Sequence, residues 1–336
     1  MKTKNLIAEK ISSLIYAASI LIFIIAFNFS DNPPSGWTQQ FLPDLNNRPL
    51  SDIQFIDSLT GYGVTGDDTI GDTNYIIKTT NSGDNWFIIN IIDKDLTDVD
   101  FININTGYVI GGLGTPGYLI KTTNGGENWI EIITPVASGF DDMFVYNEDT
   151  IWIASDNTFN GGLFKTTNGG VNWVLQYFSG ANPPRNIYMV NSQLGFFSTN
   201  NQSSLFKTTN GGMNWILMAN QNGFKDIYFT DSLTGWKSTG GIKKTTDGGL
   251  NWIEQVLPPK GGIISTSSII KFSNINSDTI WGAGGQAFYG SGRRRGIIYR
   301  TTNGGNNWMI QIPDTSFHIE GFYSIQFLNK YTGWSF

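Results

Sequence analysis

The 336-residue chain contains no cysteine and a single histidine, His318. The lack of cysteine excludes disulfides, cysteine-ligated zinc, iron–sulfur clusters and thiol catalysis. One histidine excludes mechanisms that need two imidazoles, the HExxH metalloproteases among them. Charged residues make up only 14% of the chain and the net charge is −6. The positive field that dominates nucleic-acid binding is therefore missing, and we expect no nucleic-acid partner.

The residues that are abundant indicate a folded, turn-rich protein. Hydrophobic residues make up 40% of the chain, and there are 11 Trp and 40 Gly. This content is too apolar for a disordered chain, and the glycines indicate many tight turns.

The N-terminus has the pattern of an export segment. Lys2, Lys4 and Lys10 precede an uncharged run over residues 11–29. This pattern is typical of a cleaved signal peptide or an uncleaved signal anchor, and a buried core helix is the third alternative. We expect residues 1–30 to form a separate apolar helix that can tether the protein to a membrane. The rest is then extracytoplasmic: periplasmic, lumenal, secreted or at the cell surface.

A nine-residue motif recurs along the chain. It reads basic-Thr-Thr-Asn/Asp-Gly/Ser-Gly-x-Asn-Trp, and its copies begin at Lys78, Lys121, Lys165, Lys207, Lys244 and Arg300. The spacings between the terminal tryptophans are 43, 44, 42, 37 and 56 residues. We call each copy a box. Such a period indicates a repeat architecture.

A second motif precedes each box and reads as two short strands joined by a turn, as in Asp52–Gly66 and Asp98–Gly112. Each unit then carries four short β runs, with a hairpin at Asn-Gly or Asp-Gly. Four strands in about 43 residues are typical of one propeller blade. The prediction is an all-β, seven-bladed β-propeller over residues 31–336. The expected blades lie near 51–95, 97–138, 141–182, 185–222, 225–260, 267–315, and 323–336 together with 35–45.

The last blade is expected to be split between the two ends of the chain. Ser35, Gly36 and Trp37 read as a fourth strand, and residues 324–336 read as a first and a second strand. Joining them covers two open sheet edges. This blade lacks a third strand and a box, so we expect a gap one strand wide, or a sequence that ends within a repeat.

The boxes are expected to be structural. Their glycines permit positive φ, the Asn or Asp side chain can bond the backbone two residues on, and the tryptophan packs against a sheet. The structural box residues are Thr79, Asn81, Gly83, Trp86; Thr122, Asn124, Gly126, Trp129; Thr166, Asn168, Gly170, Trp173; Thr208, Asn210, Gly212, Trp215; Thr245, Asp247, Gly249, Trp252; and Thr301, Asn303, Gly305, Trp308. The alternative is that these polar loops bind a ligand.

The box resembles the Asp-box, or bacterial neuraminidase repeat, Ser/Thr-x-Asp-x-Gly-x-x-Trp. Thr245-x-Asp247-x-Gly249-x-x-Trp252 matches it fully, and the other five copies have Asn in place of Asp. Together with the preceding aromatic strand, the pattern is similar to the propellers of the photosystem II stability/assembly factor family. The resemblance implies the fold for residues 35–336. Its relatives include assembly factors, sialidases, xyloglucanases and sortilin-type receptors, so it does not settle the activity.

The enzymatic members of this superfamily provide the alternative function, a glycoside hydrolase. A sialidase-like enzyme would need three arginines from different blades. Of the six arginines here, three are adjacent in one loop and one lies in a box. A xyloglucanase-like enzyme needs two carboxylates, for which Asp67, Asp68, Asp141, Asp142 and Asp156 are candidates.

The sequence predicts no metal and no cofactor. The spacing Asp93-x-Asp95-x-x-Asp98-x-Asp100 suggests calcium, but position six of an EF-hand loop requires Gly and Asp98 stands there. We interpret this stretch as a solvated loop in which Asp98 begins a strand.

One charge cluster is not required by the repeat. Arg293, Arg294 and Arg295 lie with Tyr289 in an enlarged loop of the sixth unit, and we predict that they bind an anionic partner. A solvated hairpin tip is the alternative. The favoured function is a non-enzymatic binding or assembly module for a protein partner or a surface glycan. A pocket near the axis with two facing carboxylates would favour the glycoside hydrolase instead.

Overall fold

The computed structural model describes residues 24–28, 36–66, 73–112, 117–136, 139–155, 157, 159–178, 180–258, 263–264, 269–289, 293–311 and 321–336. Within these ranges the regular structure is β-strand, apart from one 3-10 turn, η1 (Asn200–Gln202). No helix in this part of the chain is long and apolar enough to cross a membrane.

Six sheets are each built from strands that follow one another in the chain, and we number them as blades one to six. The first blade has β3 (Leu50–Phe55), β4 (Gly61–Thr65), β5 (Asn74–Thr79) and β6 (Phe87–Ile92); the second β7 (Leu96–Phe101), β8 (Gly107–Gly111), β9 (Tyr118–Thr122) and β10 (Ile130–Glu131); the third β11 (Asp142–Val145), β12 (Ile151–Ser155), β13 (Gly162–Thr166) and β14 (Val174–Tyr177); the fourth β15 (Pro184–Met189), β16 (Gly195–Thr199), β17 (Leu205–Thr208) and β18 (Ile216–Leu217); the fifth β19 (Ile227–Phe229), β20 (Gly235–Ser238), β21 (Ile242–Thr245) and β22 (Ile253–Glu254); and the sixth β23 (Ile263–Ile264), β24 (Ile269–Asn274), β25 (Ile280–Tyr289), β26 (Arg293–Thr301) and β27 (Met309–Gln311).

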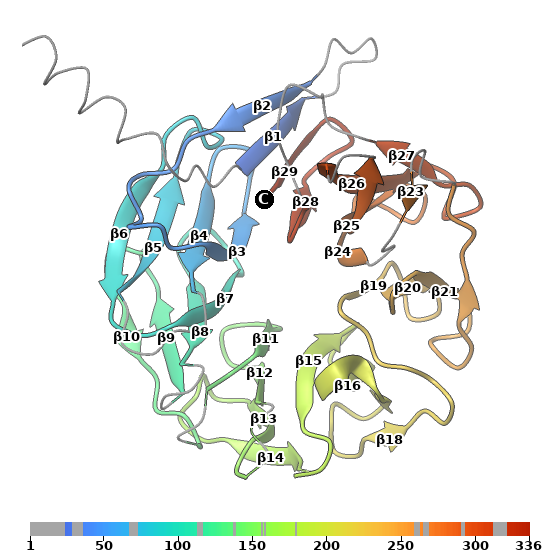
Figure 1. Cartoon of the computed structure of the whole chain (residues 1–336). Helices are drawn as coiled ribbons and strands as arrows, with labels where there is room; N and C mark the ends of the chain where they lie inside the picture. Colours follow the sequence, from blue (N-terminus) through green and yellow to red (C-terminus); the bar gives the residue numbers. More distant parts are fainter. Residues whose placement is uncertain are drawn as a thin grey trace, which may run out of the picture.

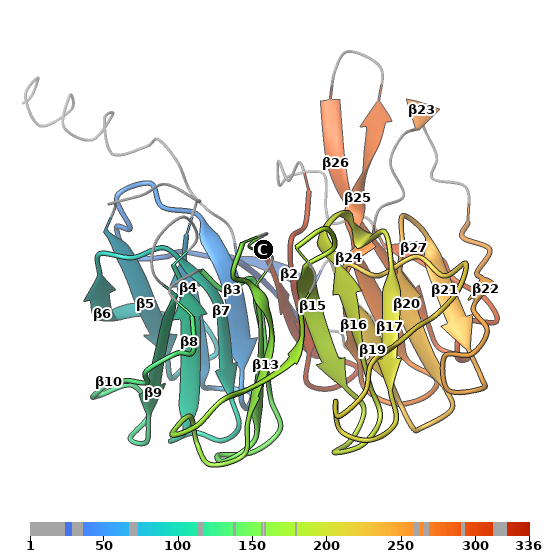
Figure 2. The same cartoon turned by 90° about the horizontal axis from the view of Figure 1, so that it is seen from below.

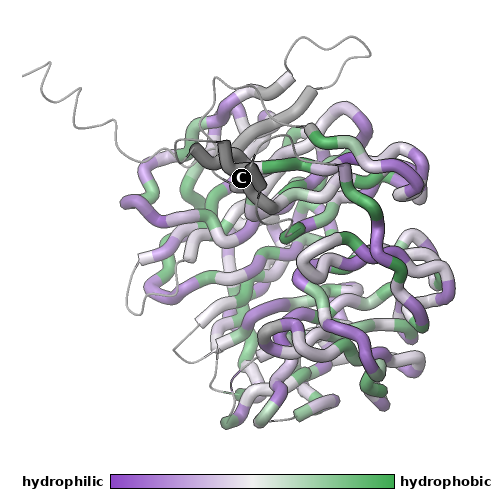
Figure 3. Tube along the Cα trace, turned by 45° about the vertical axis from the view of Figure 1, so that its right-hand side comes forward, coloured by the Kyte–Doolittle hydropathy of each residue, from purple (hydrophilic) through white to green (hydrophobic). Residues whose placement is uncertain are grey.

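The sheets stand around a common axis, so the predicted all-β propeller is confirmed (Figure 1). Strands β3, β7, β11, β15, β19 and β24 lie nearest the axis, and the later strands of each blade lie progressively outward. Hydrophilic and hydrophobic stretches follow one another along the chain trace (Figure 3). Buried and partly exposed residues alternate along the innermost strands, as in β11 and β19, which is the period of two expected for a β-strand.

A further sheet combines the two ends of the chain, and we call it the seam sheet. Its strand order is β2 (Trp37–Gln40), β1 (Ile24–Asn28), β29 (Thr332–Ser335) and β28 (Ile325–Phe327). Trp37 and the 324–336 hairpin thus share one sheet, as expected. The expected gap is not empty, because β1 pairs with both β2 and β29.

The expected apolar helix is wrong at residues 24–28, where the chain forms β1. These residues read Ile-Ile-Ala-Phe-Asn, and β-branched and aromatic residues favour strands over helices. An otherwise open position between β2 and β29 offers them both neighbours of a sheet. Residues 1–23 lie outside the described part of the chain.

Aromatic stacking joins successive blades. The ring of Tyr62 in the first blade stacks on Phe101 of the second, with centroids 3.6 Å apart. Trp334 of the seam sheet stacks in the same way on Phe55 of the first blade, at 3.5 Å. Each such Phe lies over a glycine of its own second strand: a Cβ on Gly107 would stand 2.5 Å from the Phe101 ring. The recurrent Thr-Gly-aromatic sequence is therefore explained by close packing.

The six boxes have the same internal hydrogen bonds. In the first box the Gly83 N–H donates to Thr79 Oγ1 at 2.9 Å, and the Asn85 N–H donates to Asn81 Oδ1 at 3.0 Å. The Asn side chain thus bonds the backbone four residues on, not two as expected, because the Thr hydroxyl occupies the nearer N–H groups. Equivalent bonds recur in the other five boxes.

The basic residue that opens a box reaches the next blade. Lys165 lies over the Trp152 ring at 4.5 Å and donates from Nζ to the Gly211 carbonyl of the fourth blade at 3.0 Å. The same bond joins Lys78 to Gly125, Lys207 to Gly248 and Lys244 to Gly304. These lysines therefore link adjacent boxes, which explains the basic first position of the motif.

Candidate functional site

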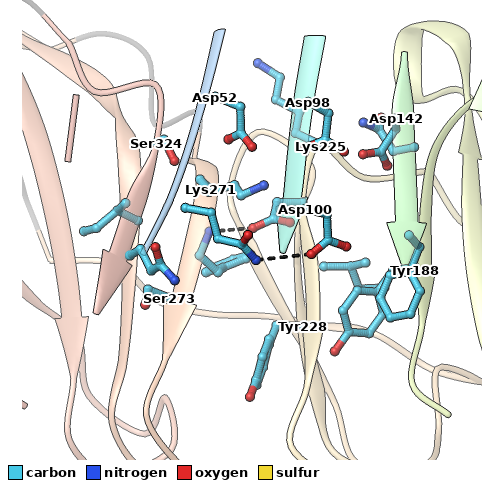
Figure 4. A pocket seen from close by; sticks show the side chains of 18 of the residues that line it. Asp52, Asp98, Asp100, Asp142, Tyr188, Lys225, Tyr228, Lys271, Ser273 and Ser324 are labelled. Carbon is cyan, nitrogen blue, oxygen red and sulfur yellow. Dashed lines mark hydrogen bonds between the residues drawn. The ribbon is translucent and has the colours of Figure 1, made fainter. Parts of the chain in front are cut away.

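A cavity of about 390 Å³ lies on the axis of the ring, lined by the innermost strands and by Ser324–Phe327. We call it the axial cavity. Figure 4 shows the carboxylates of Asp52, Asp98, Asp100 and Asp142 directed into it, together with Lys271. These side chains come from the first, second, third and sixth blades. Residues that are far apart in the sequence thus converge because each blade contributes one strand to the wall.

The lining residues occupy two levels that repeat from strand to strand. The upper level consists of one residue at or next to the start of each inner strand: Asp52, Asp98, Asp142, Asn186, Asp226, Lys271 and Ser324. The lower level lies two residues further along: Gln54, Asp100, Phe144, Tyr188, Tyr228, Ser273 and Gln326. We call these the upper ring and the lower ring. Four of the seven upper positions are acidic.

Upper-ring carboxylates accept backbone hydrogen bonds from the following blade. Asp142 accepts from the Ile187 N–H at 2.7 Å, and Asp226 accepts from the Phe272 N–H at 2.6 Å. Asp98 accepts from Met143 at 3.2 Å. Asn186 differs, because it accepts from the Ser198 hydroxyl within its own blade. The carboxylates therefore hold neighbouring inner strands together.

The lower ring continues this pattern with other side chains. Gln54 Oε1 accepts the Phe101 N–H at 2.5 Å, and its amide donates to Asp100 Oδ1 at 3.2 Å. The Tyr188 hydroxyl accepts the Phe229 N–H at 3.2 Å. Gln326 joins the seam sheet to the first blade, since it accepts from and donates to the Phe55 backbone.

The concentration of carboxylates changes their acidity. Burial raises the pKa of Asp142 to about 7, although the Ile187 N–H opposes this. Burial raises the pKa of Asp100 to about 6 and also raises that of Asp226. The pKa of Asp98 rises well above its ordinary range, through burial and then through the Asp52 and Asp142 charges. The ring therefore takes up protons close to neutral pH.

Lys271 is the cation of the upper ring. Burial alone would lower its pKa, but the Asp226, Asp52, Asp98 and Asp142 carboxylates raise the pKa above its ordinary value. Its side chain still keeps solvent-accessible surface because it projects into the cavity. Lys271 therefore remains charged and offsets part of the negative field.

Two facing carboxylates near the axis would favour a glycoside hydrolase, and the structure places several there. The Asp98, Asp142 and Asp226 carboxylates, however, each accept a backbone N–H from the following blade. Bonds of this kind join neighbouring inner strands, which favours a structural role for these carboxylates.

The structure separates the carboxylates considered from the sequence. Asp142 faces the axial cavity, whereas Asp141 pairs with Arg185 at 3.8 Å on the far side of the strand. Asp67, Asp68, Asp156 and His318 lie outside the described residues. Among the residues that are described, no three His, Cys, Asp or Glu side chains gather as a metal site.

The predicted arginine cluster lies on the hairpin of β25 and β26. Tyr289 pairs in register with Arg293, and Phe288 with Arg294. This hairpin projects from the same side of the ring at which the inner strands begin (Figure 2). The described residues that line the axial cavity include none from β25 or β26, so the cavity and the arginine cluster are separate features.

Sequence reasoning missed the role of Asp52, Asp98, Asp100 and Asp226. Asp98 was expected to begin a strand, and it does lie near the start of β7, but its side chain faces the axis. The signal was present, because Asp recurs three residues before a buried Phe in three copies of the strand motif, at Asp52, Asp98 and Asp226. An alignment of the repeats on their first strands, rather than on their boxes, would have placed the aspartates of the upper ring at one position.

Residues 80–221 match the family model described as "Photosynthesis system II assembly factor YCF48". No curated protein matches the chain. Among solved structures, "YCF48 bound to D1 peptide" is 19% identical with a TM-score of 0.64, covering 92% of this chain and 99% of that one. "YCF48 from Cyanidioschyzon merolae" is 17% identical with a TM-score of 0.58, covering 86% and 94%.

An enzyme shares the same architecture. The GH74 xyloglucanase from Xanthomonas campestris is 13% identical with a TM-score of 0.59, and the match covers 79% of this chain and 45% of that one. At such identities the likeness shows the fold alone. The comparisons therefore show a propeller fold, with a match to the assembly-factor model that is confined to the repeats of residues 80–221.

Proposed function

We propose that this assembly factor-like propeller is a non-enzymatic binding module for a protein partner. The family match over residues 80–221 supports this, and one of the similar structures is described as bound to a peptide. The observation that carries the proposal is the β25–β26 hairpin. Its strands have 10 and 9 residues, whereas the corresponding β4 and β5 have 5 and 6.

The hairpin supplies a chemistry that the rest of the chain lacks. Arg293, Arg294 and Arg295 concentrate positive charge on a protein of net charge −6, next to the aromatic residue Tyr289. Guanidinium groups bind carboxylates bidentately and stack on planar groups. The partner is therefore an acidic peptide segment. A surface glycan is the other partner that these residues suit, if it carries carboxylates.

A peptide titration tests the proposal. Fluorescence anisotropy should detect binding of an acidic peptide, with an affinity that falls as salt rises. Arg293→Gln with Arg294→Gln and Arg295→Gln should abolish binding, and Arg48→Gln, in the link before β3, should not. Equal binding by the triple variant and the wild type would contradict the hairpin site.

We also propose that the ring has seven blades, with the seam sheet as the seventh. Trp334 repeats on the first blade the contacts that Tyr62 makes on the second: its ring stacks on Phe55 and its Nε1 donates to the Ser82 carbonyl at 3.0 Å. Since the chain has no cysteine, Asn28→Cys with Thr332→Cys provides a clean test. Oxidation should close an intramolecular disulfide between the two ends. An open dithiol would contradict the pairing.

Export and tethering are part of the same proposal. The basic residues before the uncharged run over residues 11–29 support an extracytoplasmic location, and the part of this run that precedes β1 would provide the hold on the membrane. An alkaline phosphatase reporter fused after Phe336 should be active, because it needs export to fold. An inactive, stable fusion would contradict export.

The axial carboxylates keep a glycoside hydrolase as the second candidate function. Their hydrogen bonds to the backbone of the following blades favour a structural role. We expect the purified chain to hydrolyse neither sialosides nor β-glucans. Turnover that disappears in the Asp98→Asn variant would establish the enzyme instead.

A further inference from the structure

The charge of the axial cavity is unbalanced. Five carboxyl groups line it, against the two ammonium groups of Lys225 and Lys271. Lys271 belongs to the sixth blade, between Asp226 and the seam sheet. Among the described residues its ammonium makes no ion pair within 4.0 Å, so it acts on the carboxylates across the cavity. Carboxyl groups therefore remain in excess, and two of them, Asp142 and Asp226, lie on either side of the fourth blade.

That side of the cavity has an aromatic wall. Phe144, Tyr188 and Tyr228 occupy the lower ring on three successive blades. The Phe144 and Tyr188 ring centroids lie 5.6 Å apart, and those of Tyr188 and Tyr228 lie 6.4 Å apart. The three rings form a continuous arc beneath Asp142 and Asp226. Aromatic faces attract cations within about 6 Å, through their quadrupole.

The fourth blade interrupts the upper ring above this arc. Asn186 stands where its neighbours have Asp, and its carbonyl is turned toward Ser198. The sector therefore has a carboxylate on either side and the Tyr188 ring below (Figure 4 shows Asp142 and Tyr188). From this geometry we propose that the axial cavity binds an alkylammonium group, seated over Tyr188 between Asp142 and Asp226.

The chemistry of the wall selects an organic cation over a metal ion. Within the described residues no cluster of three or more acidic or imidazole ligands is arranged for a metal. The faces of aromatic rings attract an ammonium group and pack against its methylene chain. The cavity volume of about 390 Å³ is within the range of small-molecule sites. A free diamine and the side chain of a partner's lysine present the same group.

Binding should be coupled to protons. The ammonium stays charged at neutral pH, while Asp142 and Asp100 ionise near pH 7 and pH 6. Affinity therefore rises as pH increases from 5 to 8, and binding releases protons. The titratable groups that face the site are Asp52, Asp98, Asp100, Asp142, Asp226, Lys225, Lys271, Tyr188 and Tyr228.

Calorimetric titration of the full chain tests the site with cadaverine and with N-acetyl-lysine amide. Pentan-1-ol, which has the same chain without the charge, is the control ligand. We expect both amines to bind at pH 8, about tenfold more weakly at pH 5, with no heat from the alcohol. Binding of cadaverine alone would identify a free amine as the ligand, and binding of both would show that a lysine side chain fits.

Variants locate the bound group. Asp142→Asn keeps the acceptor for the Ile187 N–H and removes the charge, so the affinity should fall about tenfold or more. Tyr228→Leu should weaken binding about threefold to thirtyfold. Glu254→Gln and Tyr323→Leu change exposed residues that do not line the cavity and should leave binding unchanged.

Three results would overturn the proposal: an alcohol that binds as well as cadaverine, an affinity that does not rise with pH, or equal losses in the cavity and control variants. Where a cavity variant does not fold, the affinities of the wild type for cadaverine and for pentan-1-ol at each pH still test the proposal. Binding of an acidic peptide at the hairpin is measured separately, so failure there leaves this result intact.

Discussion

The raised pKa of Asp142 predicts an unusual pH dependence of stability. The folded protein holds this proton with a pKa of about 7, against an ordinary value of 3.8. Because the folded state binds the proton more tightly than the unfolded chain does, ionisation destabilises the fold. The cost is absent below about pH 3.8, grows as pH rises, and is complete by about pH 8.

Substituting Asp142→Asn isolates this cost. The Asn carbonyl can still accept the Ile187 N–H, which lies 2.7 Å from the carboxylate, so the change removes the charge and keeps the bond. Three pKa units correspond to at most about 4 kcal/mol at pH 8. Between pH 5 and pH 8 the wild type should lose about 2–3 kcal/mol of unfolding free energy relative to the variant. Lys271 stays charged throughout and does not contribute to this slope.

Urea unfolding at pH 5, 6, 7 and 8 measures the difference. Asp231→Asn is the control, because backbone N–H groups of Leu233 and Thr234 lower the pKa of that exposed carboxyl. It is ionised in both states across the range, so this variant should be offset by a constant amount. Parallel curves for Asp142→Asn and the wild type would refute the reasoning, since they would mean that the axial charge is already compensated.

Three further predictions concern the packing within and between blades. Trp86→Ala should lower the free energy of unfolding by about 3–5 kcal/mol, because Trp86 is 5% exposed and packs edge-on against Phe55. Arg294→Ala, on the projecting hairpin, is the control and should change the melting temperature little. Equal small effects of both changes would show that the boxes are surface features. Lys165→Met should lower the free energy of unfolding, measured by chemical denaturation, by about 1–2 kcal/mol, since it removes the bond to Gly211 and the charge over Trp152. No loss would mean that the bond to the next box does not stabilise the fold. Gly107→Ala should cost about 1–3 kcal/mol by pushing on the Phe101 ring, and Phe101→Leu in the same chain should recover part of it; a strictly additive double variant would argue against that contact.

The architecture was predictable because it is repeated. Six boxes and their preceding strand pairs specify the same hydrogen bonds six times, so local signals were averaged over the chain. The exceptional strand β1 was missed for the opposite reason. Residues 24–28 occur once, within a run whose overall composition favours a helix, and their place in a sheet depends on partners at residues 37–40 and 332–335.

The axial cavity was not predictable residue by residue. An aspartate at a strand start is ordinary in a β protein, and Asp52 gives no local sign that it faces Asp98 and Lys271. The convergence arises only when the ring closes and brings seven strands to one axis. Asp142 was named as a candidate carboxylate for its chemistry, and its placement was a consequence of the propeller geometry.

The lysine bonds between boxes have a consequence for how such a chain can vary. Each of these bonds runs from a blade to its successor, as from Lys78 to Gly125 and from Lys207 to Gly248. A unit duplicated or lost inside the array would regain the same donor on one side and the same acceptor on the other. The bonds between adjacent boxes therefore do not depend on how many units the ring contains. The pairing of the two chain ends in the seam sheet is the contact that depends on the number of units, because both ends must reach one sheet.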